Sequence, residues 1–425
     1  MSLYTFVIIA ILFIVVLYNP KSITVIYLKR LLLPFACIAF ILSLILFSET
    51  AVKSAAKGIN LWLNVVFPSL LPFFVASEIL YRTGFIKSLG VLLEPIMRPL
   101  FNVPGCGSFA LAMGITSGYP VGAKLTANMR QERLLTKTES ERLLSFTNNS
   151  GPLFIIGSVA VGMFNNSGIG FILLASHILA CLTVGIIFRF YGKKSNSIKR
   201  PKDNRILKKF KKEMTNTKQV NLGDVLGDSI RSSINTMLAI GGFIILFSVI
   251  ISLLLETGVI LLLSTYIGSV TYFFGVPRDL IASVLSGFIE ITTGINMISK
   301  TERISLVQQL SAASLVLGWA GLSVHFQVYS IISKTDISIK PYLLGKLLQG
   351  IFAATYLWSF MTILLIKGTK SQSVFGYFTF NPDWIWFNYL INSVKNISVS
   401  LIILLIMIGI SFMAKNIKAT LHKAS

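Results

Sequence analysis

Two apolar stretches of this chain are interrupted in the middle by residues that do not favour an unbroken helix. The first begins at Gly105 and reads GCGSFALAMGITSGYPVGAKL, and the second ends at Gly162 and reads LLSFTNNSGPLFIIGSVAVG. Pro120 lacks a backbone N–H, and the glycines beside it permit turn dihedrals. At membrane depth, irregular backbone survives only where protein buries it or where it lines a cavity. Broken helices of this kind form the substrate sites of many secondary transporters.

The remainder of the chain is apolar enough to place these breaks inside a bilayer. Of 425 residues, 54% are hydrophobic and only 13% are charged, about half the charged share of a globular domain. Several runs reach the roughly 20 residues that cross a bilayer. The composition therefore predicts an all-α polytopic membrane protein whose partner is the lipid bilayer. The net charge of +22 fits basic cytoplasmic loops better than nucleic acid, for which no motif is present.

The chain divides into five regions by hydropathy and charge. We expect two N-terminal transmembrane helices (1–48), a first gate repeat (49–191), a basic cytoplasmic linker (192–220), a second gate repeat (221–366), and a C-terminal transmembrane helix with a basic tail (367–425). The linker is interpreted as a solvated loop that fixes orientation, or alternatively as a patch that binds lipid or a partner.

The two repeats resemble each other weakly. Val103-Pro104 matches Val276-Pro277, and Gly114 matches Gly287. The TSGYPVGA motif corresponds to EITTGINM, and LLSFTNNSGPLFIIGSV parallels LSAASLVLGWAGLSVHFQV in a register that the sequence leaves open. Each copy follows an amphipathic segment, of which the first, Ala51–Leu63, is expected at the membrane interface.

The distribution of basic residues predicts the topology. We expect segments 105–123 and 279–299 to be re-entrant hairpins that return to their own side of the membrane. The charged linker 124–142, the 193–218 loop and the C-terminus then all lie in the cytoplasm, and Lys300 lies outside. This arrangement gives about nine spans, including Leu3–Leu17, Leu31–Phe47, Leu63–Tyr81 and Trp386–Met413, with the amino terminus outside. The two repeats are then inverted, as an alternating-access transporter requires.

The polar residues of the breaks are the candidate substrate-binding groups, because the new amino ends of broken helices favour anions. They are Thr116, Ser117, Gly118, Tyr119, Lys124, Asn148, Asn149 and Ser150 in the first half, and Glu290, Thr292, Thr293, His325 and Gln327 in the second. The alternative is that they cap broken backbone and join helices. His177, in an ordinary span, is expected to pack in the core or to lie at the membrane interface.

Glu290 and Lys124 are the charged members of this set. An intramembrane carboxylate is a functional candidate, and Glu290 is predicted to couple a proton or cation to transport, with a structural partnership to Thr292 or a basic residue as the alternative. Lys124 either receives an anion or extends to the interface. No metal-ligand spacing, hydrolase motif or phosphate loop is present. We therefore expect no enzyme activity, cofactor, catalytic residue or metal site.

The runs LLPFFVASEIL, GITSGYPVGAKLTANMR, ERLLSFTNNSGPLF and GFIEITTGIN resemble the YlbJ/SpoVV family of sporulation integral membrane proteins, over roughly residues 50–365. The resemblance implies the nucleoside-recognition gate domain, which is shared with concentrative nucleoside transporters and the iron transporter FeoB. It also implies transport of dipicolinic acid, a small dianion, across the outer forespore membrane. A nucleoside or metal ion as substrate, a non-transporting scaffold and a homo-oligomer remain open.

Overall fold

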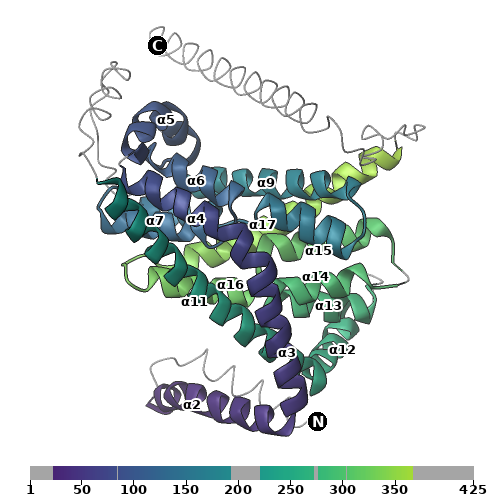
Figure 1. Ribbon diagram of the computed structural model, residues 1–425. Coiled ribbons are helices and arrows are strands. Elements are labelled where there is room, and N and C mark those ends of the chain that lie inside the picture. Colours follow the sequence, from purple (N-terminus) through teal and green to yellow (C-terminus); the bar gives the residue numbers. More distant parts are fainter. Residues whose placement is uncertain (1–22, 84, 193–220, 272–275, 303, 367–425) are drawn as a thin grey trace, which may run out of the picture.

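The structure is a computed structural model, and it describes residues 23–83, 85–192, 221–271, 276–302 and 304–366. Within these residues the regular secondary structure is helical throughout, and no strand occurs (Figure 1). The predicted spans Leu3–Leu17 and Trp386–Met413 lie outside the described residues, as does the basic linker from 193 onward.

The described chain folds into short and long helices that pack side by side. In chain order they are α2 (Ile23–Leu46), α3 (Ser48–Leu61), η1 (Trp62–Val66), α4 (Phe67–Arg82), α5 (Phe85–Phe101), α6 (Gly107–Thr116), α7 (Val121–Gln131), α8 (Lys137–Thr147), η2 (Leu153–Met163), α9 (Gly168–Phe188), α11 (Leu222–Glu256), α12 (Val259–Thr271), α13 (Arg278–Ile289), α14 (Ile291–Ser299), α15 (Leu306–Trp319), α16 (Gly321–Ile332) and α17 (Ile339–Ile366).

Several of these helices are long and apolar enough to cross a membrane. Among the described residues they are Gly168–Phe188, Leu222–Glu256 and Leu306–Ile332, together with the pair Pro34–Leu46 and Ser48–Asn64, which is bent by 100°. The predicted all-α membrane fold with broken helices is confirmed. The figure of about nine spans stays a prediction, because part of the chain lies outside the described residues.

Helices α3, η1 and α4 follow one another and pack antiparallel to α11. The buried face of α3 lies against the C-terminal half of α11, where a Cβ on Gly58 would stand 3.0 Å from the Cα of Ile245. At the other end, Arg82 of α4 pairs with Asp228 of α11 at 3.1 Å. The expected amphipathic segment Ala51–Leu63 is helical, with Ala51, Ser54 and Gly58 on its buried face. It continues into α4 through the π-helical η1. Its position at the membrane interface stays a prediction.

Two antiparallel helical hairpins contain the predicted segments 105–123 and 279–299, and the first extends beyond its predicted end. In the first, α6 and α7 are joined by a turn at Gly118 that includes a cis peptide bond before Pro120. In the second, α13 and α14 pack so closely that a Cβ on Gly294 would overlap the backbone of Gly287. Figure 1 shows the two hairpins on opposite sides of the view. Small residues permit this close approach of the helix backbones.

The segment 124–142 was expected to be a charged linker, and this prediction is wrong for most of its length. Helix α7 runs on to Gln131, and α8 begins at Lys137, so most of this segment is helical. Burial explains the difference, because Leu125 and Met129 lie one turn apart on an apolar face that packs into the core. A capping box between Thr136 and Glu139 then starts α8.

The second member of each half is a helix broken in its middle. The first break, residues 148–152, separates α8 from η2. The second break separates α15 from α16 at Ala320 and Gly321, whose φ angles are +79° and +83°. The first break falls at the residues that the sequence predicts, and the second lies a few residues before His325, beside which a break was expected. The π-helical hydrogen bonding of η2 is a local adjustment that the sequence does not reveal.

Arg130 and Arg133 near the end of α7 and Lys334 after α16 lie together at one end of the molecule, which we call the basic end. There Arg142 of α8 donates to the carbonyl oxygens of Tyr191 at 2.6 Å and of Asn102 at 2.9 Å. The opposite end holds Phe164 and Ile298, which pack in one cluster. The first hairpin therefore opens at the basic end and the second at the opposite end. The sidedness of the two hairpins relative to a membrane stays a prediction, as does the absolute orientation.

Candidate functional site

The tip of each hairpin lies against the break of the helix that follows it. In the first half, a Cβ on Gly118 would stand 2.8 Å from the backbone nitrogen of Gly151. In the second half, a Cβ on Gly321 would stand 3.2 Å from the carbonyl oxygen of Gly287. The two halves therefore use the same contact, in which a glycine lets irregular backbone pack on irregular backbone.

Side chains connect the two pairs of tip and break. Tyr119, at the first tip, packs in the same cluster as Ala320, at the second break. Its hydroxyl lies 3.0 Å from the Oγ of Ser150. Tyr342 of α17 bridges the halves, because its hydroxyl accepts from the Nδ2 of Asn148 at 3.1 Å and lies 3.2 Å from the Nδ1 of His325. The four irregular segments therefore meet around one buried polar cluster.

Lys346 of α17 is the charged centre of this cluster, and its side chain is fully buried, with 0% exposed. Its Nζ donates to the backbone oxygen of Asn148 at 2.9 Å and to the Oε1 of Gln349 at 2.8 Å. The amide of Gln349 in turn donates to the Oδ1 of Asn149 at 2.7 Å. Among the described residues, no carboxylate forms an ion pair with Lys346.

His177 of α9 completes the cluster on the side of the first break. Its Nε2 accepts from the backbone N–H of Ser150 at 3.3 Å and also lies 3.3 Å from the amide nitrogen of Gln349. Because Nε2 accepts, a neutral ring carries its proton on Nδ1. That Nδ1 is buried without a partner among the described residues. His177 is buried as expected, but it is hydrogen-bonded to the break rather than simply packed in an apolar core.

The structure brings most of the predicted site residues to this region. Ser117, Asn148, Asn149, Ser150, Glu290, His325 and Gln327 are buried. Within the described chain, Ser117 Oγ, Asn148 Oδ1 and His325 Nε2 are buried without a hydrogen-bond partner. Thr116 is exposed and bonds back to the oxygen of Ala112 at 2.9 Å, so it lies at the edge. Unpartnered polar atoms are costly in a protein interior unless a ligand or water pairs with them.

Glu290 is the amino-terminal cap of α14. Its carboxylate accepts from the backbone N–H groups of Thr292 at 3.0 Å and Thr293 at 2.7 Å. The carboxylate thus neutralises the partial positive charge of that helix end. Thr292 and Thr293 contribute backbone donors to this cap. The structural partnership weighed from the sequence is present, and a role in coupling remains a prediction.

The side chain of Lys124 contacts residues of α4 and α11 and not the helix breaks. Its Nζ lies 3.3 Å from the carboxylate of Glu78 and 3.1 Å from the hydroxyls of both Ser232 and Thr236. Its ammonium is therefore engaged with α4 and α11. A direct contact between Lys124 and substrate stays a prediction that would require this ion pair to open.

Sequence reasoning did not identify Lys346, Gln349 or Tyr342. All three belong to α17, which reads as an ordinary terminal span of the second repeat. A signal for them is present, since Tyr342, Lys346 and Gln349 recur at spacings of four and three residues, which places them on one helix face. A lysine inside an apolar helix is itself a functional candidate.

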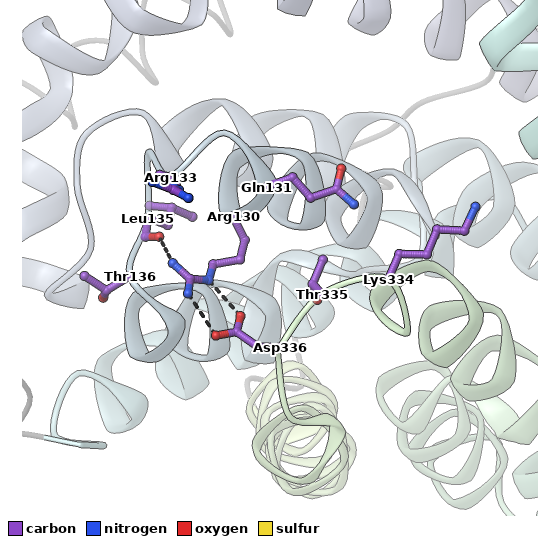
Figure 2. A pocket seen from close by; sticks show the side chains of 8 residues that line it. All are labelled: Arg130, Gln131, Arg133, Leu135, Thr136, Lys334, Thr335 and Asp336. Carbon is purple, nitrogen blue, oxygen red and sulfur yellow. Dashed lines mark hydrogen bonds and ion pairs between the residues drawn. The ribbon is translucent and has the colours of Figure 1, made fainter.

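A second feature is a surface pocket of about 390 Å³ at the basic end, between the end of α7 and the end of α16 (Figure 2). It is lined by Arg130, Gln131, Arg133, Leu135, Thr136, Lys334, Thr335 and Asp336. Arg130 donates to both carboxylate oxygens of Asp336 at 2.8 Å and to the backbone oxygen of Leu135 at 2.9 Å. Its guanidinium therefore ties the first half to the second at this surface.

Comparison with known proteins places the chain in a family. The profile of the Gate family, described as nucleoside recognition, matches residues 63–194. The sporulation integral membrane protein YlbJ of Bacillus subtilis (strain 168) is 44% identical over 314 residues, which are 72% of this chain and 77% of that protein. Solved structures of CNTnw give lower similarity: 14% identity and a TM-score of 0.43 for a variant in an outward-facing state, over 78% of this chain and 88% of that one. The structure of CNTnw in an inward-facing substrate-bound state has 13% identity and a TM-score of 0.44, over 77% of this chain and 87% of that one. The chain belongs to the YlbJ family of sporulation integral membrane proteins.

Proposed function

We propose that this protein transports dipicolinate across the outer forespore membrane of a sporulating bacterium by alternating access. The observation that carries the proposal is the fully buried Lys346, which lies where the hairpin tips and helix breaks converge. Membership in a family of sporulation membrane proteins supplies the biological context. The substrate itself follows from the resemblance described above and from the chemistry of the cluster.

The charge of the cluster favours an anion. A buried ammonium is costly unless opposite charge or strong hydrogen bonds compensate it, and Lys346 has hydrogen bonds but no ion-paired carboxylate among the described residues. Dipicolinate carries two carboxylates on a planar ring. One carboxylate can take a charge-assisted hydrogen bond from the ammonium, and the Nδ1–H of His177 is a further donor beside the break.

The arrangement of the halves supports movement between two open states. The two hairpins open at opposite ends of the molecule, and α4 runs antiparallel to α11, which occupies the corresponding place in the second half. These relationships fit an inverted repeat. We infer that each tip separates in turn from its break, so that the cluster opens first toward one end and then toward the other.

Glu290 sets a condition on the substrate. A carboxylate near the site repels a dianion unless its charge is compensated, and the two backbone donors of α14 provide that compensation. In this proposal Glu290 holds the second tip in shape while substrate is bound. Its release from α14 is the step at which a proton or cation would be exchanged.

A nucleoside is the main alternative substrate, because the matching family profile is described as nucleoside recognition. Purified protein should be heated with dipicolinate, isophthalate, uridine or ferrous ion, and its melting temperature compared. Dipicolinate should stabilise the protein by about 2.7 kcal/mol at a concentration of 100 Kd. Isophthalate, which has a C–H group in place of the ring nitrogen, should stabilise it less. Stabilisation by uridine or ferrous ion but not by dipicolinate would identify a different substrate.

A membrane scaffold is the alternative from another functional class. The basic loop 193–218 is the segment through which a scaffold would recruit partners. Replacement of this loop by a neutral linker of equal length should leave dipicolinate binding intact in a transporter. A scaffold would show no dipicolinate binding in either form, and sporulation would fail when the loop is replaced.

A further inference from the structure

The break after α8 leaves the carboxyl end of a half-helix inside the molecule. The last carbonyl groups of a helix have no partners within it, and together they carry about half a negative charge. At this end the side chains of Asn149 and Cys181 donate to the oxygen of Phe146 at 2.8 and 2.9 Å. The oxygen of Asn148 receives the ammonium of Lys346 instead.

Glycines on two sides bring other helices against the same end. A Cβ on Gly114 or Gly122 of the first hairpin would overlap the oxygen of Thr147. On the other side, a Cβ on Gly345 of α17 would stand 2.6 Å from the oxygen of Ser145. Gly345 directly precedes Lys346 in the sequence. The close approach of α17 therefore brings the lysine to the broken end, and the surrounding protein encloses it completely.

In secondary transporters, unwound carbonyl groups and the carboxyl ends of half-helices coordinate the coupling cation. We propose that the Lys346 ammonium is a resident cation at the broken end of α8, so that no dissociable sodium ion binds at this end. The inference deepens the proposed function and rests on it for the role of the cation in transport. It assigns to Lys346 a charge-specific contact with the half-helix rather than a packing role.

Two features of the contact between Lys346 and the broken end of α8 indicate that this position favours a cation rather than a neutral hydrogen-bond donor. The ammonium bonds to two oxygens, the carbonyl of Asn148 and the Oε1 of Gln349, and oxygen ligands are what a hard cation requires. Gln349 is held in that orientation because its own amide donates to Asn149. Each oxygen acceptor therefore faces the ammonium, and the amide donors face away from it.

The test compares the melting temperature of purified protein without substrate in sodium chloride and in choline chloride at equal ionic strength. Wild type should melt at the same temperature in both salts, apart from any effect of sodium that Glu290→Gln removes. Lys346→Ala should melt at a lower temperature and should regain part of the loss in sodium chloride or ethylammonium chloride, because a small cation can enter the vacated space. Lys346→Met, which fills the space without charge, should be destabilised and should regain nothing. Lys340→Ala, at an exposed position of the same helix, is the matched control and should resemble wild type.

Two results would overturn the proposal. One is stabilisation by sodium relative to choline that is present in wild type and persists in Glu290→Gln, which would show a dissociable sodium site away from the Glu290 cap. The other is a Lys346→Met protein as stable as wild type, which would show that the charge is not needed. If Lys346→Ala yields no folded protein, the wild-type comparison and Lys346→Met still decide. Because no substrate is present, failure of dipicolinate to bind would leave this result unaffected.

Discussion

Gly118 and Gly151 pack backbone against backbone, and this contact joins the tip of the first hairpin to the break of the first split helix. A Cβ on Gly118 would stand 2.8 Å from the backbone nitrogen of Gly151, and one on Gly151 would stand 2.9 Å from the oxygen of Ser117. Gly118 also has a φ of +91°, which side chains other than hydrogen rarely permit. The contact therefore requires glycine for both space and conformation.

Valine at Gly118 or Gly122 should abolish transport. At Gly118 a β-branched side chain opposes the left-handed backbone, at a cost of about 1–2 kcal/mol or more, in addition to the clash. At Gly122 it would overlap the oxygen of Thr147. Uptake at equal membrane abundance is the measurement, and Gly242→Val is the matched control because no atom lies within 4 Å of a Cβ there. Gly170, the start of an ordinary helix, is a poorer control, since its Cβ would stand 3.2 Å from Ala160. Equal flux in all variants would remove the reason for placing the site at the tip.

Substitutions of Glu290 can distinguish its role as the cap of α14 from a role in coupling. Glu290→Ala loses both hydrogen bonds to α14 and should lower the free energy of unfolding by about 0.5–2 kcal/mol. Glu290→Gln keeps one acceptor and should be destabilised less. If Glu290 exchanges a proton or cation, Glu290→Gln should also abolish net accumulation of dipicolinate and the dependence of uptake on pH or cation. Wild-type flux with unchanged pH and cation dependence in Glu290→Gln would exclude the coupling role.

The ion pair between Arg130 and Asp336 should make a small, pH-dependent contribution to stability. Hydrogen bonds from the Arg130 guanidinium lower the pKa of Asp336 below its ordinary value. A carboxyl group whose folded pKa is lowered stabilises the protein above its unfolded pKa, and this contribution disappears as the pH falls through the folded pKa. Both side chains are partly exposed, so Asp336→Asn should cost only about 0.2–1 kcal/mol at pH 7. The difference in melting temperature should hold down to about pH 4, near the ordinary pKa of an aspartate, and should then shrink as the pH falls through the folded pKa; a difference that stays constant well below that pH would mean that the carboxylate charge is not responsible.

Cysteine labelling can establish the absolute orientation. In a Cys37→Ser background, Glu132→Cys and Lys334→Cys lie at the exposed basic end, and Lys300→Cys lies at the opposite end. The positive-inside rule predicts that an impermeant thiol reagent applied from outside labels only Lys300→Cys. Labelling of Glu132→Cys and Lys334→Cys with protection of Lys300→Cys would invert the orientation. Labelling of all three from outside would contradict the arrangement of the two hairpins.

Much of the fold could be predicted because glycine, proline and polar residues inside apolar runs have a clear physical meaning. The turn at Pro120 and the break at Pro152 fall where a proline that lacks a backbone donor stands beside glycine. A second break was expected beside His325, but the repeat did not fix its register. The extension of α7 was missed because its charged residues suggested a loop, although Leu125 and Met129 carried a helical apolar period.

The candidate site was predicted less completely. Residues of the breaks were found because polar groups at membrane depth need partners. The partners themselves, Tyr342, Lys346 and Gln349, are distant in sequence from the breaks, and only packing of α17 brings them there. The ion pair of Lys124 with Glu78 was missed for the same reason.

The central claim is that the buried cluster is the site of a dipicolinate transporter. It is tested most directly by uptake of radiolabelled dipicolinate into liposomes that contain the purified protein, preloaded with unlabelled dipicolinate so that exchange needs no ion gradient. Wild type should exchange label well above protein-free liposomes, excess unlabelled dipicolinate but not uridine should compete, and Gly118→Val should exchange no more than the empty liposomes. Absence of exchange by folded wild-type protein, or competition by uridine alone, would contradict the claim.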